Sequence, residues 1–172
     1  MVTTSQSERY RLARLIENTF FAHYDGGRPG QACLYWAHYT VEVLKALGVL
    51  AVFQAGSASW PRLRPDQDDG VSPTHHSYVW EPDSVVTKAR IVAGAMPELH
   101  VWAAIPEHGE IIDMTTRYWA EQCRLIQKLD WPGDKPPTYF WGTADEMPAG
   151  VMYAPDMTAI ALALHLLKGD LP

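Results

Sequence analysis

The sequence predicts an α+β protein in which N-terminal helices pack on an antiparallel sheet. Apolar residues recur at helical spacing in residues 7–21 and again in residues 31–47. Beyond Gly48 this spacing gives way to short runs rich in Val, Ile, Tyr and Trp, which favour strands. Two helices followed by a series of strands are typical of the α+β class.

The first helix is predicted over residues 7–21, where one apolar stripe alternates with arginines. The stripe consists of Leu12, Leu15, Ile16 and Phe20. Residues 24–30, with the sequence YDGGRPG, contain too much glycine and proline to continue this helix. They predict a loop between the first two helices.

The second helix is predicted to begin at about Gln31 and to end at Gly48, where a left-handed cap costs little. Its apolar positions are Cys33, Ala37, Val41, Leu44 and Leu47. Cys33 therefore falls in the first turn.

Four short runs are predicted to form the strands of one antiparallel sheet. They are residues 49–55, 76–81, 99–105 and 110–115. Residues 61–73 are rich in proline and charge and predict an exposed excursion between the first two strands. Residues 84–94 suit a strand and a helix equally well.

Two more helices are predicted in the last third of the chain. Residues 116–129 carry Trp119, Cys123 and Ile126 at helical spacing, and the sequence DWPG ends this segment. A last helix over 157–168 follows Asp156 as its N-cap and stops at Gly169.

Composition limits the function classes. The 172 residues, 47% of them hydrophobic, predict a single domain spanning 1–172. The formal charge of -6 and the absence of a Lys/Arg run argue against nucleic acid as a partner. The longest apolar stretch, 160–167, is too short to span a bilayer, and residues 1–10 lack the apolar core of a secretory signal. We therefore expect a cytoplasmic protein that binds no membrane and keeps both cysteines as free thiols.

A cysteine at a helix start has the chemistry of a nucleophile. The thiolate is the reactive form, and only a few per cent of an ordinary thiol is ionised at pH 7. A helix dipole contributes ~0.3 to 1 kcal/mol, which is less than one pKa unit at ~1.36 kcal/mol per unit. A neighbouring imidazolium, held in place by a carboxylate, would supply the rest.

His100 and Asp113 are the candidates for these two partners. They lie in consecutive predicted strands, 99–105 and 110–115. A four-residue loop at 106–109 would pair Ile105 with Glu110, which places His100 and Asp113 diagonally on one face. A two-residue turn would keep them on the same face but farther apart, and a three-residue loop would place them on opposite faces.

Four short motifs together resemble the transglutaminase-like branch of the papain-like cysteine enzymes. They are Gly30-Gln31-Ala32-Cys33, the helix end LKALGV at 44–49, His100-Val101-Trp102 and Ile112-Asp113-Met114-Thr115. The order Cys, His, Asp along the chain also matches, and the similarity covers about residues 30–115. In that family the cysteine opens a helix packed on an antiparallel sheet, and the histidine and aspartate come from adjacent strands.

The resemblance implies an enzyme of acyl transfer that needs no cofactor. Cys33 would be the nucleophile, His100 the general base and acid, and Asp113 the carboxylate that orients the imidazole. We expect hydrolysis of an amide in a peptide or protein through a thioester. The glutamine that binds the oxyanion in papain-type enzymes has no clear counterpart before Cys33. Candidate donors are the Cys33 backbone N–H and the side chains of Gln31 and Trp36.

Several other interpretations stay open at this level. Cys33 could be an inert core thiol, which would make the protein a binding domain on the same fold. An amine instead of water could resolve the thioester. His75, His76, His100 and Asp113 could form a metal site, although neighbouring residues in a strand point to opposite faces. Cys123 is most simply a core residue.

Overall fold

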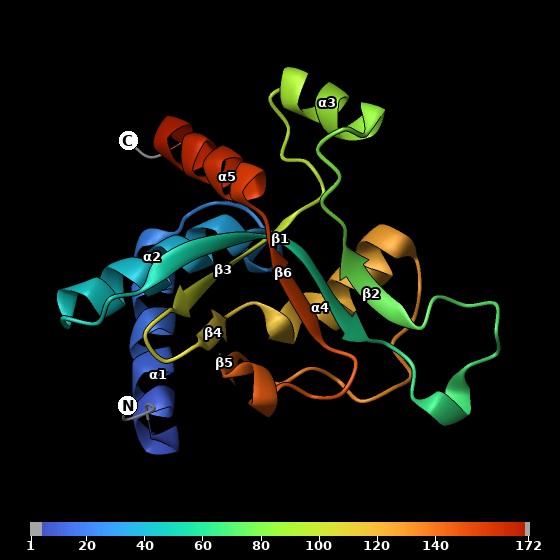
Figure 1. Cartoon of the computed structure of the whole chain (residues 1–172), viewed down its shortest axis with the longest axis horizontal. Helices are drawn as coiled ribbons and strands as arrows, with labels where there is room; N and C mark the ends of the chain where they lie inside the picture. The colour runs from blue at the N-terminus through green and yellow to red at the C-terminus, as the bar shows by residue number, and fades with distance from the viewer. Residues whose placement is uncertain (1–4, 171–172) are drawn as a thin grey trace.

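One curled antiparallel sheet with helices packed against it organises the chain (Figure 1). The computed structural model describes residues 5–170. Within this range the strand order is β2 (His75–Tyr78), β1 (Val52–Pro61), β3 (His100–Ile105), β4 (Glu110–Asp113) and β5 (Phe140–Gly142), and β6 (Met152–Pro155) also pairs with β1. The α+β prediction is confirmed.

The two N-terminal helices cover one face of the sheet. They are α1 (Gln6–His23), which Ser5 caps by accepting a hydrogen bond from the Glu8 N–H, and α2 (Cys33–Ala46). Their shared core contains Leu12, Ile16, Phe20, Trp36 and Leu44 together with Ala103, Ile105 and Ile112 of the sheet. Both helices agree with the sequence prediction to within about two residues. Leu15, which was assigned to the buried stripe, is 43% exposed, because residues spaced by four align on the buried face and Leu15 lies beside that row.

The sheet contains two strands that the sequence pattern did not reveal. β5 and β6 are short, and proline ends β6, so neither shows a clear alternation. β1 also runs six residues beyond its predicted end at 55, because its second half pairs with both β2 and β6. The close approach of β6 requires Gly56, where a Cβ atom would lie 2.1 Å from the Ala154 carbonyl oxygen.

The segment after β4 departs most from its prediction. Residues 116–129 do not form one helix but a 3-10 turn, the short α4 (Trp119–Gln122) and a π turn over Cys123–Gln127. Lys128 ends the segment in a left-handed conformation. Single π turns occur mostly within α-helices, frequently at functional sites. The altered winding leaves Ile126, predicted on the buried stripe, 57% exposed.

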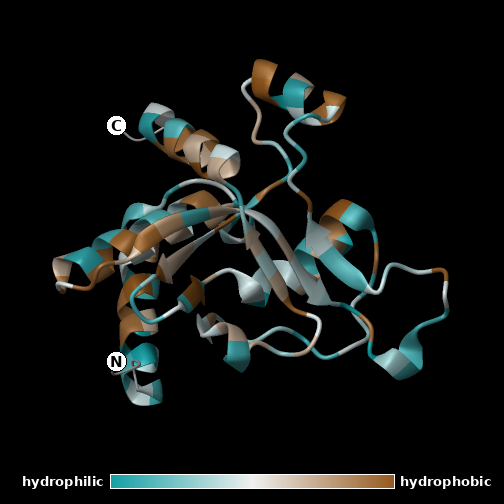
Figure 2. Cartoon of the chain, in the orientation of Figure 1, coloured by the Kyte–Doolittle hydropathy of each residue, from teal (hydrophilic) through white to brown (hydrophobic). Residues whose placement is uncertain are grey.

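Two more helices complete the fold. The ambiguous residues 84–94 form α3 (Val85–Val92), which stands away from the sheet and exposes Val85 and Val92 (Figures 1 and 2). The last helix is α5 (Met157–Asp170). Asp156 caps it, as predicted, by accepting hydrogen bonds from the backbone N–H groups of Thr158 and Ala159. Among the described residues, no helix combines the length and the apolarity needed to cross a membrane.

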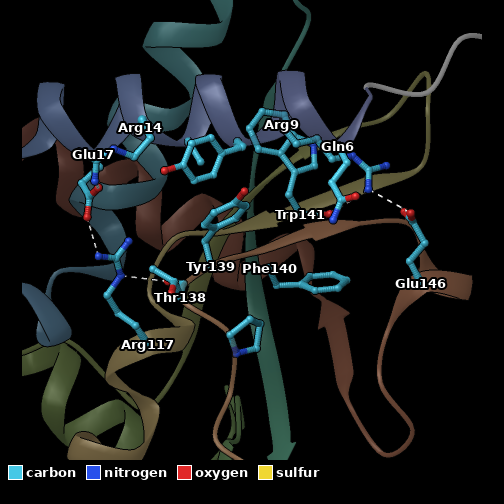
Figure 3. Close-up of a pocket in the computed structure, with 13 residues that line it drawn as sticks. Gln6, Arg9, Arg14, Glu17, Arg117, Thr138, Tyr139, Phe140, Trp141 and Glu146 are labelled. Carbon is cyan, nitrogen blue, oxygen red and sulfur yellow. Dashed lines mark hydrogen bonds and ion pairs between the residues drawn. The ribbon is translucent and has the colours of Figure 1, made fainter.

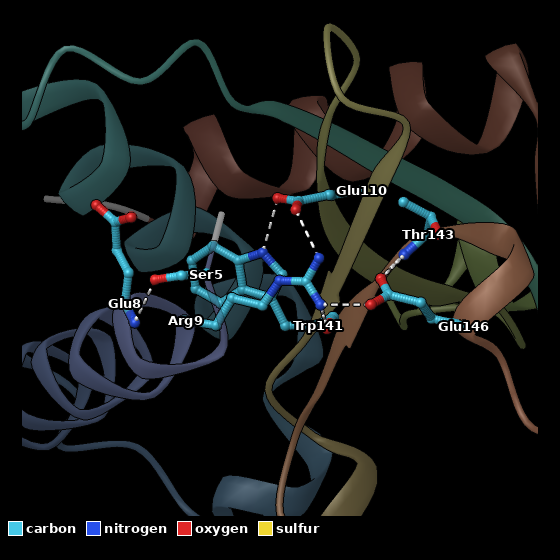
Figure 4. A network of polar contacts seen from close by, with 7 residues as sticks. All are labelled: Ser5, Glu8, Arg9, Glu110, Trp141, Thr143 and Glu146. Atoms are coloured by element: carbon cyan, nitrogen blue, oxygen red, sulfur yellow. Dashed lines mark hydrogen bonds and ion pairs between the residues drawn. The ribbon is translucent and has the colours of Figure 1, made fainter. Parts of the chain in front are cut away.

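A buried ion pair ties α1 to the far edge of the sheet (Figure 4). Arg9 donates to the carboxylate of the fully buried Glu110 at 2.8 Å, and Trp141 Nε1 donates to the same carboxylate at 3.0 Å. The guanidinium also reaches Glu146. Because Glu110 begins β4, this network holds the hairpin that carries Asp113 against α1.

The excursion at 61–73 is better anchored than its composition suggests. Arg62 is 4% exposed and donates to the carbonyl oxygens of Pro73 and Asp130. These bonds close the base of the loop, while its tip around Val71 is exposed.

Candidate active site

Cys33 opens α2, in the first turn as predicted. A 3-10 turn over Pro29–Gln31 leads into the helix, and Leu34, Trp36 and Ala37 anchor its first turns in the core. Cys33 is half-buried and packs against the core cluster that contains Leu99 and Val101. The helix therefore presents the sulfur at its N-terminal end, next to the residues where β3 begins.

His100 and Asp113 meet across the β3–β4 hairpin. Ile105 pairs with Glu110, so the loop has four residues, and the register that places both side chains on one face is confirmed. His100 Nε2 lies 2.8 Å from Asp113 Oδ2, and both residues are almost completely buried. The sequence hypothesis of a His–Asp pair agrees with this geometry.

Within residues 5–170, Asp113 takes part in four hydrogen bonds. Besides His100, Tyr153 donates its hydroxyl to Oδ2 at 2.8 Å. Thr115 donates its backbone N–H and its hydroxyl to Oδ1 at 2.8 and 2.6 Å. Trp60 in turn donates to the Tyr153 oxygen. A carboxylate that accepts this many bonds has a fixed position and stays ionised.

The electrostatics of the pair favour a charged imidazole. Burial by itself lowers the pKa of His100, but the Asp113 carboxylate and then the Cys33 sulfur outweigh burial and raise this pKa to about 10. Burial raises the pKa of Asp113, but the charge and hydrogen bond of His100, followed by the bonds from Thr115, shift it below its ordinary value. Cys33 therefore acts in the same direction as Asp113 on the pKa of His100.

The two ring nitrogens of His100 have different surroundings. Nε2 is bonded to Asp113, whereas Nδ1 is buried and has no hydrogen-bond partner within residues 5–170. Aromatic rings restrict the imidazole: Tyr78 stacks on it at a centroid distance of 5.1 Å, and Trp119 presents its edge at 5.1 Å. The ring is thus oriented by Asp113 and restricted by its aromatic neighbours, and Nδ1 has no competing hydrogen bond within residues 5–170.

A cavity of about 340 Å³ opens beside Cys33. Its wall includes Gly30, Gln31, Tyr78, Glu98 and Gln122. The volume lies at the lower end of the range for small-molecule sites, which suits one substrate side chain or a short acyl group.

The two side chains proposed as oxyanion donors differ in their placement. Gln31 is exposed and lines the cavity together with Cys33. Trp36 does not fit the role, because its ring is 1% exposed and stacks on Phe20 at 3.6 Å. Its indole N–H donates to the Pro29 carbonyl. Packing against Phe20 of α1 holds the Trp36 indole in the core, although Trp36 follows Cys33 by only three residues.

The histidines proposed for a metal site are not gathered. His75 contacts Thr74, whereas His76 contacts Gln127, as expected for neighbours on opposite faces of a strand. Within residues 5–170 no three His, Cys, Asp or Glu side chains are arranged to hold a metal ion. The alternative set of His75, His76, His100 and Asp113 is therefore not assembled.

The second cysteine is a core residue, as expected. Cys123 is fully buried and donates to Gln127 Oε1 at 3.4 Å. Burial raises the pKa of its thiol. Cys123 therefore provides an internal reference for the reactivity of Cys33.

A second, larger cavity lies between α1 and the segment that leads into β5 (Figure 3). It has a volume of about 870 Å³ and shares no lining residue with the Cys33 cavity. Its charged groups form ion pairs: Arg9 contacts Glu146, and Glu17 contacts both Arg14 and Arg117. Its lining contains no cysteine, serine or histidine among the described residues.

Sequence reasoning missed three contributors to the site. Tyr78, Tyr153 and Gln122 come from β2, β6 and α4. Tyr78 belongs to the predicted strand 76–81, so the sequence placed it in the sheet but did not predict that its ring stacks on His100. The other two belong to segments whose pattern was weak or misassigned, and no local signal identified them.

The hydroxyl of Tyr153 gives a testable link between β6 and Asp113. Tyr153→Phe removes the donor to Asp113 and leaves the Trp60 N–H without its acceptor, so we expect a loss of about 1–3 kcal/mol of unfolding free energy. Urea denaturation measures this loss. Tyr10→Phe, at a tyrosine that is 61% exposed, is the matched control and should change stability by less than about 0.5 kcal/mol. Equal stability of both variants would contradict the assigned role of the hydroxyl.

Comparison with known proteins adds information about the fold. No protein-family model and no curated protein matches this chain. One solved structure, the crystal structure of genomics APC5867, is similar with a TM-score of 0.56 and 18% sequence identity. The match covers 96% of this chain and 73% of the other. At this identity the likeness concerns the architecture alone, and the chain has the α+β fold of helices on a curled antiparallel sheet.

Proposed function

We propose that the protein is a cysteine hydrolase of the papain-like, transglutaminase-like type that cleaves an amide bond in a peptide or protein. The observation that carries the proposal is the buried His100–Asp113 pair at 2.8 Å, with Cys33 packed against the cluster that contains Leu99 and Val101, the residues on either side of His100. A nucleophile, a base and an orienting acid on three rigid elements form the pattern of acyl-transfer sites.

The first half of the reaction forms a thioester. Protonated His100 favours the thiolate of its cysteine neighbour. The Cys33 sulfur attacks the carbonyl carbon of the substrate, and the carbonyl oxygen takes up negative charge. His100 donates its Nδ1 proton to the leaving nitrogen, the C–N bond breaks, and an amine leaves. Asp113 keeps the ring in place and stabilises its charge before transfer.

The second half restores the enzyme. Neutral His100 now accepts a proton from water at Nδ1, and the hydroxide oxygen attacks the thioester carbon. The C–S bond breaks, so a carboxylic acid and the thiolate are formed beside a protonated imidazole. Burial of His100 and Asp113 keeps bulk water away from their mutual bond, which strengthens it.

Selective alkylation tests the proposal. Iodoacetamide at pH 7 should label Cys33 at least about tenfold faster than Cys123, because Cys123 is fully buried and burial raises the pKa of its thiol. His100→Ala should remove most of this advantage. His23→Ala, at an exposed histidine, is the control and should leave the rate unchanged. Peptide mapping by mass spectrometry measures both sites. Slow and equal labelling of the two cysteines would favour a binding domain instead.

A further inference from the structure

The amide of Gln122 is an unpaired polar group in the interior. Gln122 ends α4 and is 1% exposed, yet neither its Nε2 nor its Oε1 has a hydrogen-bond partner within the described range 5–170. An unsatisfied buried group costs about 1–3 kcal/mol, and native proteins retain few of them. An unpaired amide of this kind indicates a group that binds there.

This amide faces the cavity of Cys33. Gln122 lines the cavity together with Gly30 and Cys33. A Cβ atom placed on Gly30 would lie 2.7 Å from Gln122 Nε2, so the amide rests against the backbone just before α2. Gly30 is the residue type that leaves room for it, since any side chain there would displace the amide.

The start of α2 provides a second donor of the same kind. The first backbone N–H groups of an α-helix have no acceptor within the helix, and Cys33 is the first residue of α2. The Cys33 N–H and the Gln122 amide therefore border one cavity from two elements. Two N–H donors beside a nucleophilic sulfur are the arrangement that stabilises a carbonyl oxygen as it becomes negative.

We propose that Gln122 donates its side-chain N–H to the oxygen of the carbonyl that Cys33 attacks. This assignment rests on the proposed acyl-transfer function. It replaces Trp36, whose N–H is bonded to Pro29, and it places the donor after the acid in the chain rather than before the cysteine.

His76 is the other unpaired group on the cavity wall, through its Nε2. Burial lowers the pKa of His76, so the ring is neutral, and its Nδ1 is already bonded to Gln127. A neutral imidazole donates from only one nitrogen, whereas a carboxamide always carries N–H groups. Gln122, which touches the Gly30 backbone, is therefore the better donor for the oxyanion.

Two reactions of Cys33 separate this role from a structural one. Acylation by p-nitrophenyl acetate passes through an oxyanion, whereas alkylation by iodoacetamide attacks a saturated carbon and does not. Gln122→Met keeps the length of the side chain and removes the donor. We expect its acylation rate to fall about 100- to 1000-fold, with alkylation within about twofold of the wild-type rate. Gln54→Met, at a glutamine outside the cavity, should leave both rates unchanged.

Stability provides an independent readout. Replacing a glutamine whose amide stabilises the fold lowers the stability of the protein. Replacing an unpaired amide by an apolar group of similar shape does not. The Tm of Gln122→Met should therefore equal or exceed that of the wild-type protein. Gly30→Ala is the second variant: its methyl group would press on the Gln122 amide and on the Tyr118 Cβ atom, so acylation should fall while alkylation is retained.

The outcomes are distinct. A parallel fall of acylation and alkylation, or an unchanged acylation rate in Gln122→Met, would overturn the role of Gln122 while leaving Cys33 as nucleophile. Absence of ester acylation in the wild-type protein, together with equal slow labelling of Cys33 and Cys123, would overturn the proposed function and the role of Gln122 with it.

Discussion

Cys33→Ser is expected to reduce amide and ester hydrolysis by at least about 10³-fold, the scale on which loss of a nucleophile acts in triad enzymes. Serine has nearly the same shape, but its hydroxyl ionises far less readily than a thiol, and the half-buried position tolerates it. The release of p-nitrophenol from p-nitrophenyl acetate, with the mass of the acylated protein as a second measurement, would report the loss.

Cys123→Ser is the matched control for this substitution. It removes the other thiol, at a fully buried position outside the cavity. We expect acylation at Cys33 to survive, even if the buried hydroxyl costs stability. Acylation that persists in Cys33→Ser and disappears in Cys123→Ser would show that Cys123, and not Cys33, is the nucleophile.

Asp113→Asn is expected to have the largest effect on stability. It keeps the shape of the side chain but leaves the buried His100 without its counter-charge, and breaking a buried pair costs about 3–5 kcal/mol. The imidazole should then be neutral at pH 7, so alkylation of Cys33 should slow as well. Urea denaturation and iodoacetamide labelling measure the two effects.

In the wild-type protein, the shifted pKa values of His100 and Asp113 make the unfolding free energy depend on pH. In the wild-type protein the pKa of His100 is raised to about 10, so its contribution to the unfolding free energy is complete below pH 6.5 and is lost as the pH rises toward 10. The lowered pKa of Asp113 makes its contribution complete above about pH 4 and removes it in stronger acid.

Asp113→Asn should reverse the histidine contribution, because burial alone lowers the pKa of an imidazole. The difference in unfolding free energy between wild type and variant should therefore shrink from pH 7 to pH 10. Denaturation curves at four or five pH values test this slope. A difference that stays constant over the whole range would show that His100 and Asp113 do not form a charged pair.

The sequence was most informative where a structure depends on neighbouring residues. The helix that begins at Cys33 follows from a local apolar period and a Gly/Pro-rich loop. The alignment of His100 with Asp113 follows from the length of a four-residue connection, because side chains alternate along a strand. These short-range rules were sufficient to place the three proposed catalytic residues.

The features of the site that the sequence did not predict depend on contacts between segments far apart in the chain. Tyr153 lies 40 residues after Asp113 in the sequence and reaches it through the pairing of β6 with β1, which no local pattern encodes. The apolar spacing predicts Gln122 within a regular helix. In the structure, Gln122 ends the short α4, which follows a 3-10 turn and precedes a π turn. Trp36 matched a donor by residue type alone, and tertiary packing assigned its indole to the core.

The close approach of β6 to β1 at Gly56 also has a consequence for biosynthesis. The first 113 residues include the Cys33 sulfur, the His100 imidazole and the Asp113 carboxylate. The tyrosine that donates a hydrogen bond to this carboxylate is residue 153. A ribosome-bound fragment that ends between residues 113 and 153 lacks the hydrogen bond from Tyr153 to Asp113. The site of the enzyme we propose would thus be complete only after residue 153 has been synthesised and β6 has paired with β1 beside Gly56.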